Sequence, residues 1–406
     1  MQQRRRFRIL QTLGKGGFGT VYRAELSDAG GFAKQVALKI MSYEGEEADT
    51  IARRMRDEAR MLGLIRHRAI VGVNSLVPLQ DGWGVVMEYV DGVDLSSCIK
   101  AGPIPVAAAL EVIEEVSGAL NAAYTAKKPN QKDTLRLIHR DIKPSNIRVT
   151  PQGEVKLLDF GVAHAEFAGK EAEESSEFVM GSTRYMAPER RRGWETHQGD
   201  VYALGLVLAN ALTRKRFPEP PEREQDHARF LGTVLETVRK ALAASESTEI
   251  RAAASQIRIL LLEMLAYEPM DRPDASSIER RIRKTRKSLP APWLREWADS
   301  GVARLIRVQA EAMEEDSDTG RVLVETPSGG PEPPQWETPP VPYDDTREES
   351  SSIRQLVPPP TPLPPRERPR PLGVPKKTVG ALMAASFAAG IVAAVLGSML
   401  ISAVFG

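Results

Sequence analysis

The sequence has very little cysteine and almost no net charge. Its single cysteine, Cys98, excludes an internal disulfide and fits a reducing compartment, and we expect its side chain to be buried or half-buried. The 55 Lys and Arg residues nearly balance the 54 Asp and Glu residues, so the net charge of +1 creates no overall field toward nucleic acid. The first residues, MQQRRRFRIL, are basic but lack the apolar core of a secretion signal. These absences favour a cytoplasmic protein that does not bind nucleic acid.

Proline is unevenly spread and divides the chain. Residues 1 to about 287 have the apolar periodicity of a globular domain, whereas 16 of the 30 prolines lie in residues 327–375. Such a stretch cannot bury enough apolar area to offset the entropy of ordering. We therefore predict a linker over residues 288–378 that is largely disordered from about residue 326. Its first part, 288–325, contains helix-like amphipathic runs that either pack on the globular domain or pair with a partner.

Charged side chains are absent from residues 378–406. Residues 379–405 would form a helix of about 40 Å, longer than the roughly 20 residues that a bilayer core requires. We predict a single transmembrane helix over 379–405, with a buried core helix as the alternative. Because basic residues precede the helix, the rest of the chain should be cytoplasmic. They are Arg366, Arg368, Arg370, Lys376 and Lys377.

Two further expectations concern this apolar run. The sequence ends at Gly406, so we expect no domain on the far side of the membrane. Small residues recur at four-residue spacing, in Gly390/Ala394 and Ala393/Gly397, which permits close helix pairing. Homodimerisation through them is a hypothesis.

The globular part begins with strands and continues with helices. FRILQTLGKGGFGTVYRAEL contains two β-like runs around a glycine cluster, and QVALKIM is a short apolar strand. EEADTIARRMRDEARMLGLI and PVAAALEVIEEVSGALNAAY have helical periodicity. The predicted fold class is α+β, with a small strand-rich lobe followed by a larger helical lobe.

The glycine cluster has the G-x-G-x-x-G spacing, in Gly14, Gly16 and Gly19. Dinucleotide-binding folds open a helix at the third glycine, whereas here the strand formers Thr20 and Val21 follow it. A glycine-rich hairpin lets backbone N–H groups close over phosphates without obstruction by side chains. An ordinary hairpin turn is the alternative.

A lysine and a glutamate follow the hairpin. Lys39 lies on the strand QVALKIM, and Glu58 falls on the apolar face of the next predicted helix. A carboxylate that faces inward needs a cation, because burying it unpaired is expensive. We predict a Lys39–Glu58 ion pair; the alternative is a pair within the helix between Glu58 and Arg54.

The segment LIHRDIKPSNIRV carries the strongest signal. Asp141 precedes Asn146 by five residues on a loop between apolar runs, so the pair can present a base and a metal ligand to one point. LLDFG then supplies a second candidate metal ligand, Asp159, and GSTRYMAPE and GDVYALGLVL follow.

With these motifs in this order, the sequence resembles the protein kinase superfamily over residues 7–287. The resemblance implies a bilobal kinase fold, with a β-rich N-lobe at 7–90 and a helical C-lobe at 91–287. The arrangement with a membrane helix is similar to that of bacterial membrane-attached serine/threonine kinases of eukaryotic type.

The resemblance also implies the catalytic roles. Asp141 would accept the proton of the substrate hydroxyl, and Lys143 would steady the transferred γ-phosphate. Asn146 and Asp159 would hold Mg²⁺, with Mn²⁺ as an alternative, and Lys39, positioned by Glu58, would contact the α- and β-phosphates of ATP. Lys143, two residues after the catalytic aspartate, is the serine/threonine-kinase form.

ATP-binding and structural residues follow from the same motifs. Met87 fits the gatekeeper position, Glu88 and Val90 the hinge that binds adenine, and Asp94 a ribose contact. The residues expected to cover ATP are Leu13, Gly14, Lys15, Gly16, Gly17, Phe18, Gly19 and Val21. The expected structural residues are Leu62, His139 and Phe160 in an apolar spine, Asp200 in the central buried helix, and the pair Glu189 and Arg272.

The function implied is transfer of the γ-phosphoryl group of Mg-ATP to Ser or Thr hydroxyls of proteins, in membrane-anchored signal transduction. A pseudokinase scaffold that binds nucleotide or partners without phosphotransfer is the alternative. Arg140 should bind an anion, and we hypothesise autophosphorylation at Ser175 or Ser176, with Ser182 at the substrate-side hydroxyl position. Neighbouring glutamates could supply the charge instead; they are Glu171, Glu173, Glu174 and Glu177.

Overall fold

The computed structural model describes residues 5–16, 19–27, 31–41, 62–79, 82–127, 133–160, 183–311 and 319–326. The predicted proline-rich spacer, the predicted transmembrane helix at 379–405 and Glu58 with most of its helix lie outside these residues. No helix in the described ranges combines the length and apolarity needed to cross a bilayer.

An antiparallel sheet of six strands forms the N-terminal lobe, in the order β4-β5-β3-β2-β1-β9. Phe7 and Ile9 of β1 are buried, whereas Arg6 and Arg8, which alternate with them, are exposed. This alternation is typical of a strand with one covered face. The strands are β1 (Arg6–Gly16), β2 (Gly19–Ser27), β3 (Ala33–Met41), β4 (Val73–Leu79), β5 (Gly82–Glu88) and β9 (Val322–Val324).

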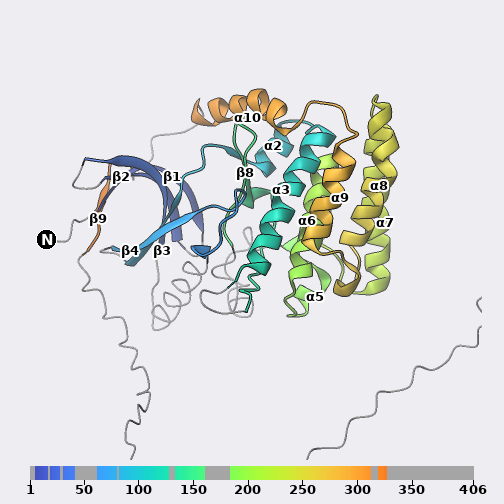
Figure 1. Cartoon of the computed structure of the whole chain (residues 1–406), viewed down its shortest axis with the longest axis horizontal. Helices are drawn as coiled ribbons and strands as arrows, with labels where there is room; N and C mark the ends of the chain where they lie inside the picture. Colours follow the sequence, from blue (N-terminus) through green and yellow to red (C-terminus); the bar gives the residue numbers. More distant parts are fainter. Residues whose placement is uncertain are drawn as a thin grey trace, which may run out of the picture. The chain divides into compact units, whose positions relative to one another are not determined.

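Helices make up most of the second lobe, which Figure 1 shows beside the sheet. A small sheet of order β6-β7-β8 carries the loops nearest the first lobe. Its strands are β6 (Val93–Asp94), β7 (Ile147–Val149) and β8 (Val155–Leu157), with the 3₁₀ turn η1 (Pro144–Asn146) before β7. The helices are α2 (Leu95–Ala101), α3 (Val106–Thr125), α5 (Pro188–Arg191), α6 (His197–Thr213), α7 (Glu224–Ala243), α8 (Thr248–Met264), α9 (Ala275–Arg286) and α10 (Leu294–Glu311), with the turn η3 (Pro269–Asp271).

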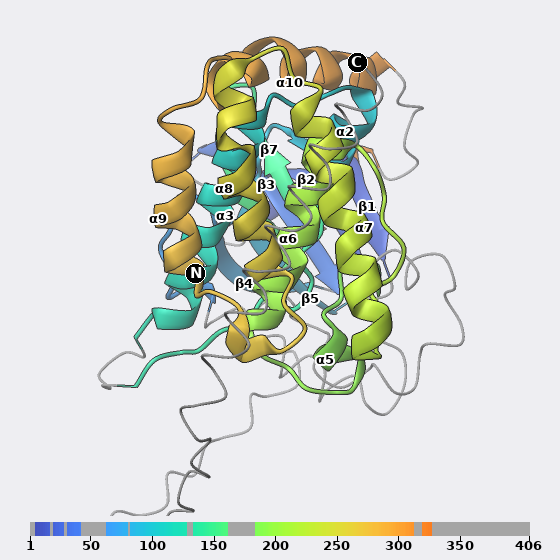
Figure 2. The same ribbon diagram turned by 90° about the vertical axis from the view of Figure 1, so that its right-hand side faces the viewer.

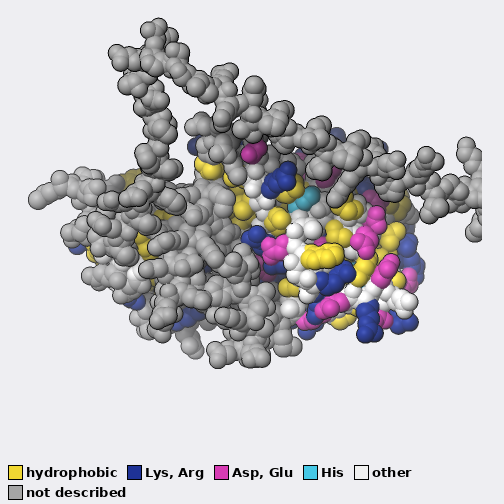
Figure 3. Space-filling model, turned by 90° about the horizontal axis from the view of Figure 1, so that it is seen from below, with side chains coloured by type: hydrophobic (Ala, Val, Ile, Leu, Met, Phe, Trp, Pro, Cys, Tyr) yellow, Lys and Arg dark blue, Asp and Glu magenta, His cyan; other side chains and the backbone are white. Residues whose placement is uncertain are grey.

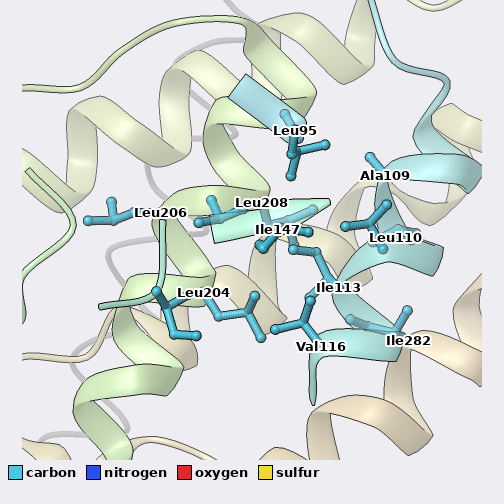
Figure 4. Close-up of a cluster of buried hydrophobic side chains, with 14 of the residues drawn as sticks. Leu95, Ala109, Leu110, Ile113, Val116, Ile147, Leu204, Leu206, Leu208 and Ile282 are labelled. Carbon is cyan, nitrogen blue, oxygen red and sulfur yellow. The ribbon is translucent and has the colours of Figure 1, made fainter. Parts of the chain in front are cut away.

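Helix α6 is the centre of the second lobe. Its residues from Asp200 to Ala211 are all buried, as expected of a helix that is apolar on every side. Figure 4 shows Leu204 and Leu208 of this helix facing Ile113 of α3 and Ile147 of β7. Cys98 of α2 is buried in the same cluster, and burial raises the pKa of its thiol to about 12, so it is an inert core residue.

Close packing explains a glycine in α6. A Cβ atom added at Gly205 would lie 2.9 Å from Cδ2 of Leu265. A larger residue would force the buried side chain of Leu265 to move.

The segment after α9 packs back on both lobes, which settles the choice that the sequence left open. Helix α10 contacts α2, α3 and β6, and both ribbon views show it lying across one end of the helical lobe (Figures 1 and 2). β9 then pairs with the edge strand β1, with Leu323 opposite Phe7. Residues 294–311 and 319–326, which fall within the predicted linker 288–378, therefore pack against the two lobes.

Contacts around β9 extend beyond the strand itself. Ile9 donates its N–H to the carbonyl of Arg321 over 2.8 Å, and Thr326 donates to the carbonyl of Pro78 over 3.1 Å. Arg5 donates to the side chain of Ser75 over 2.7 Å. The bond from Ile9 covers part of the polar edge that β1 would otherwise expose. The other two bonds connect residues that flank β9 and β1 to β4.

Leu323 and Val322 offer a matched test of this strand. Leu323 packs against the sheet's apolar cluster, whereas Val322 is 52% exposed. Leu323→Asp should release β9, so that the amide of Ile9 exchanges its hydrogen at least about tenfold faster, while amides of α3 are unaffected. Val322→Asp should leave the exchange of Ile9 unchanged. Equal exchange at Ile9 in both variants would show that β9 does not protect β1.

Candidate active site

The glycine-rich segment forms a hairpin between β1 and β2. Gly14 lies opposite Val21 and Gly16 opposite Gly19, so a strand and not a helix follows the last glycine, as predicted. Gly19 has φ of 126°, a conformation that side chains rarely adopt. Gly17 and Phe18 lie outside the described residues.

Lys39 reaches the second lobe from the middle of the sheet. It lies opposite Val21 on β2 and Val85 on β5. Its Nζ is 3.2 Å from Oδ1 of Asp159, and the Lys39 side chain is 18% exposed. The described partner of Lys39 is thus Asp159, while the predicted partner Glu58 falls outside the described residues.

Asp141 is held by two neighbours from its own loop. Nζ of Lys143 lies 2.7 Å from Oδ2 of Asp141, and Nδ2 of Asn146 donates to the same oxygen over 2.9 Å. Asn146 also donates to the backbone carbonyl of Asp141 over 2.8 Å. These contacts fix the orientation of a carboxylate that is only 14% exposed.

Asp200 of α6 positions the backbone of that loop. Its two carboxylate oxygens accept the N–H groups of His139 and Arg140 over 2.7 and 2.8 Å. Arg140 takes a left-handed φ of 72°, a strained conformation that these bonds help to maintain. Burial raises the pKa of Asp200, and the two N–H donors act in the opposite direction.

His139 links the catalytic loop to the DFG segment. Its Nδ1 accepts the N–H of Asp141 over 3.2 Å, so Nε2 carries the proton and donates to the carbonyl of Leu158 over 2.9 Å. Burial lowers the pKa of His139, in agreement with a neutral ring. The ring lies 4.6 Å from that of Phe160, and Leu62 belongs to the same buried cluster as Phe160.

The oxygen donors at this site fit a hard divalent cation. Asn146 turns its Nδ2 toward Asp141, which leaves its Oδ1 as the ligand atom, and Asp159 adds a carboxylate that is 47% exposed. Within the described ranges, no group of three or more His, Cys, Asp or Glu side chains could hold a metal ion.

Comparison with known proteins identifies this arrangement. Residues 7–281 match the family described as protein kinase domain. The chain belongs to the protein kinase family. It is 36% identical over 212 residues to the serine/threonine-protein kinase PrkC of Bacillus subtilis, covering 51% of this chain and 30% of PrkC. It is 32% identical over 271 residues to the tyrosine-protein kinase MasK of Myxococcus xanthus, covering 65% of this chain and 40% of MasK.

A third relative and a solved structure complete the comparison. The serine/threonine-protein kinase PknA of Mycobacterium tuberculosis is 34% identical over 218 residues, covering 52% of this chain and 47% of PknA. The crystal structure of the M. tuberculosis PknI kinase domain covers 69% of this chain and 95% of that chain, at 22% identity and a TM-score of 0.49. The chain thus spans less than half the length of these three curated relatives.

An ion pair connects the two lobes at the end of β5, where the hinge was predicted. Oε1 of Glu88, the last residue of β5, lies 2.7 Å from Nζ of Lys156 on β8. Its backbone N–H donates to the carbonyl of Gly72 over 2.8 Å. Met87 precedes it on β5, and Val90 is buried. Lys156 was not among the predicted residues, because nothing in the sequence links it to β5.

Asp94, the predicted ribose contact, has a structural role at the start of α2. Its oxygens accept the N–H and the hydroxyl of Ser97 over 2.9 and 2.8 Å, which makes it the N-cap of that helix. A ribose contact would have to share these oxygens.

Arg140 has a carboxylate partner among the described residues. Its Nε donates to Oε2 of Glu195 over 2.5 Å, and the two side chains are 23% and 32% exposed. The predicted anion was a phosphorylated Ser175 or Ser176; both residues, like Ser182, lie outside the described ranges. No sequence pattern indicated Glu195, which precedes α6 by two residues and is distant from Arg140 in the chain.

A buried ion pair anchors the APE segment. Nη1 and Nη2 of Arg272 lie 2.6 and 2.8 Å from the two oxygens of Glu189, and the side chains are 0% and 1% exposed. Arg272 also donates to the carbonyls of Ala266 and Tyr267 and lies over the ring of Tyr202. The predicted pair is therefore present, with its remaining donors satisfied.

Breaking this pair should be costly. Glu189→Gln keeps the volume but leaves the buried Arg272 without its counter-charge, and should lower the free energy of unfolding by about 3 kcal/mol or more. Glu222→Gln is the control, because Glu222 is 54% exposed in its ion pair with Arg191 and should lose less than about 1 kcal/mol. Urea denaturation of both variants measures the difference, and equal losses would contradict the assigned importance of the buried pair.

Proposed function

We propose that this chain is a protein kinase that transfers the γ-phosphoryl group of ATP to Ser or Thr hydroxyls of proteins. The observation that carries the proposal is the Asp141 carboxylate held between Lys143 and Asn146, in a loop whose backbone Asp200 fixes. The same structure places Lys39 of the N-lobe against Asp159.

The geometry supports a direct transfer. The substrate hydroxyl gives its proton to Asp141 as its oxygen bonds to the γ-phosphorus, and the bond to the bridging oxygen of ADP breaks. Lys143, 2.7 Å from Asp141, lies where it can offset charge on the transferred group. Asn146 and Asp159 would hold Mg²⁺, which neutralises phosphate charge; Mn²⁺ satisfies the same oxygen donors.

The proposal also specifies that Ser and Thr, and not Tyr, accept the phosphate. The relatives include proteins named as serine/threonine kinases and one named as a tyrosine kinase. We assign Ser and Thr because Lys143 stands two residues after Asp141, the serine/threonine form that the sequence resembles. The side chains placed for catalysis argue against the pseudokinase alternative.

Replacing the base should test the proposal. Asp141→Asn should retain the fold but lower phosphate transfer from labelled ATP about 10²–10⁴-fold, because the amide cannot accept the proton. Asp226→Asn is the control, since Asp226 lies on α7 in an exposed ion pair with Arg229. Phosphoamino acid analysis of the product should yield phosphoserine or phosphothreonine. Equal labelling by the wild type and Asp141→Asn would refute the enzyme assignment. A product that contains only phosphotyrosine would refute the assignment of Ser and Thr as the acceptors.

We also propose that residues 379–405 attach the kinase to a membrane from the cytoplasmic side. Support comes from the uncharged run and from the basic residues that precede it. The described surface visible in Figure 3 mixes basic and acidic side chains, in keeping with the net charge of +1. Pairing of such helices through Gly390 and Gly397 would give a homodimer.

Membrane fractionation tests this attachment. The full chain should sediment with membranes and resist alkaline carbonate, whereas Val392→Asp/Leu396→Asp should be extracted, because each charge costs about 3 kcal/mol at the centre of a bilayer. The apolar control Val392→Leu/Leu396→Val should behave as the wild type. Carbonate-resistant sedimentation of the doubly charged variant would disprove the predicted span.

A further inference from the structure

A cationic cavity lies beside the catalytic loop. It has a volume of about 370 Å³ and is enclosed by α2, the loop around η1 and the end of α6. Basic side chains contributed by all three surround it, namely Lys100, Lys143, Arg214 and Arg216. The described residues that line it include no Asp or Glu.

The cavity is adjacent to the point of phosphate transfer. Lys143, one of its lining residues, lies 2.7 Å from the carboxylate of Asp141. An extended peptide advances about 3.3 Å per residue, so side chains a few residues from the acceptor hydroxyl can enter the cavity. Its position is that of a site for the residues that flank the phosphorylated one.

Part of the cavity is held rigidly in place. Arg214, in a left-handed conformation at the end of α6, donates to the carbonyls of Ile99 and Lys100 over 3.1 Å each. Asn210 accepts the hydroxyl of Tyr185 over 3.0 Å and donates to the carbonyl of Lys215 over 2.9 Å. The cationic wall therefore exists before any substrate binds, which lowers the entropic cost of binding.

The rim lacks counter-charges within the described structure. Lys100, Arg214 and Arg216 are all exposed, and none forms an ion pair with another described residue. Cations gathered around a concave site repel one another and attract an anionic ligand. A substrate with carboxylates next to its acceptor serine would satisfy them.

The chain itself contains segments of this composition. Glu173 and Glu174 directly precede Ser175 and Ser176, and Glu177 follows. In the proline-rich region, a second pair of glutamates directly precedes Ser350. We infer that the cavity binds carboxylates that flank the acceptor serine, so that the kinase selects acidic protein segments, its own Ser175–Ser176 segment among them. This inference rests on the proposed kinase activity.

Peptide kinetics with the full chain test the selectivity. One peptide has the sequence of residues 168–180, and its partner carries Gln at 171, 173, 174 and 177. We expect kcat/KM for the acidic peptide to exceed that for the Gln peptide by at least about tenfold, and the ratio to fall as salt is raised. Peptides with Gln only before or only after the serines identify which flank enters the cavity.

Charge reversal locates the effect in the cavity. In the double variant Lys100→Glu/Arg216→Glu, the ratio of kcat/KM for the acidic peptide to that for the Gln peptide should fall close to one. The value of kcat/KM for the Gln peptide itself should change less than about twofold. Lys215→Glu is the matched control: Lys215 is exposed beside Arg216 but does not line the cavity, so its ratio should stay as in the wild type.

The outcomes separate this inference from the proposed function. Equal kcat/KM for both peptides in the wild type, or a ratio that survives the double reversal, overturns the cavity assignment while leaving the kinase activity demonstrated. Failure to phosphorylate any peptide, with no labelling of the chain itself, overturns both.

Discussion

The buried carboxylate of Asp200 is the constraint on which the catalytic site depends. By accepting the N–H groups of His139 and Arg140, it joins the central helix α6 to the backbone immediately before Asp141. A carboxylate in the core is tolerated only with such partners, because an unpaired one would be expensive to bury. His139 extends the connection to the carbonyl of Leu158, next to Asp159. The Asp200 carboxylate thus connects the hydrophobic core to the backbone before Asp141 and, through His139, to the segment that contains Asp159.

A second constraint comes from the chain beyond the helical lobe. α10 lies on α2, α3 and β6, and β9 completes the six-stranded sheet at the free edge of β1. β1 also carries the first glycines of the hairpin expected to cover ATP. The polypeptide that leads toward the proline-rich residues is therefore bonded to the strand that supports the glycine-rich hairpin. Glu88 and Lys156 add a separate contact between the lobes, from the end of β5 to β8.

Charged side chains have different roles in different parts of the chain. The Glu189–Arg272 pair is fully buried and has its donors satisfied, so it acts as a structural anchor. Arg140 and Glu195 are partly exposed, and Glu195 supplies an anion at the position where a phosphorylated loop residue was expected. The cations around the cavity at α2 and α6 form no ion pair with another described residue, which distinguishes a binding surface from the paired sites.

The sequence by itself determined the family and the order of the lobes, because the glycine spacing, HRDIKPSN and DFG are local patterns whose chemistry requires particular residue types. The roles of the side chains in these motifs stay predictions. The resemblance to protein kinases also implied that Asp200 lies in a central buried helix, and α6 is that helix. The tertiary structure alone decided that β9 pairs with β1, that Arg140 meets Glu195, and that Lys100, Arg214 and Arg216 surround one cavity. Each of these joins residues far apart in the chain, and neither a three-residue strand nor an isolated surface charge has a periodicity that identifies its partner.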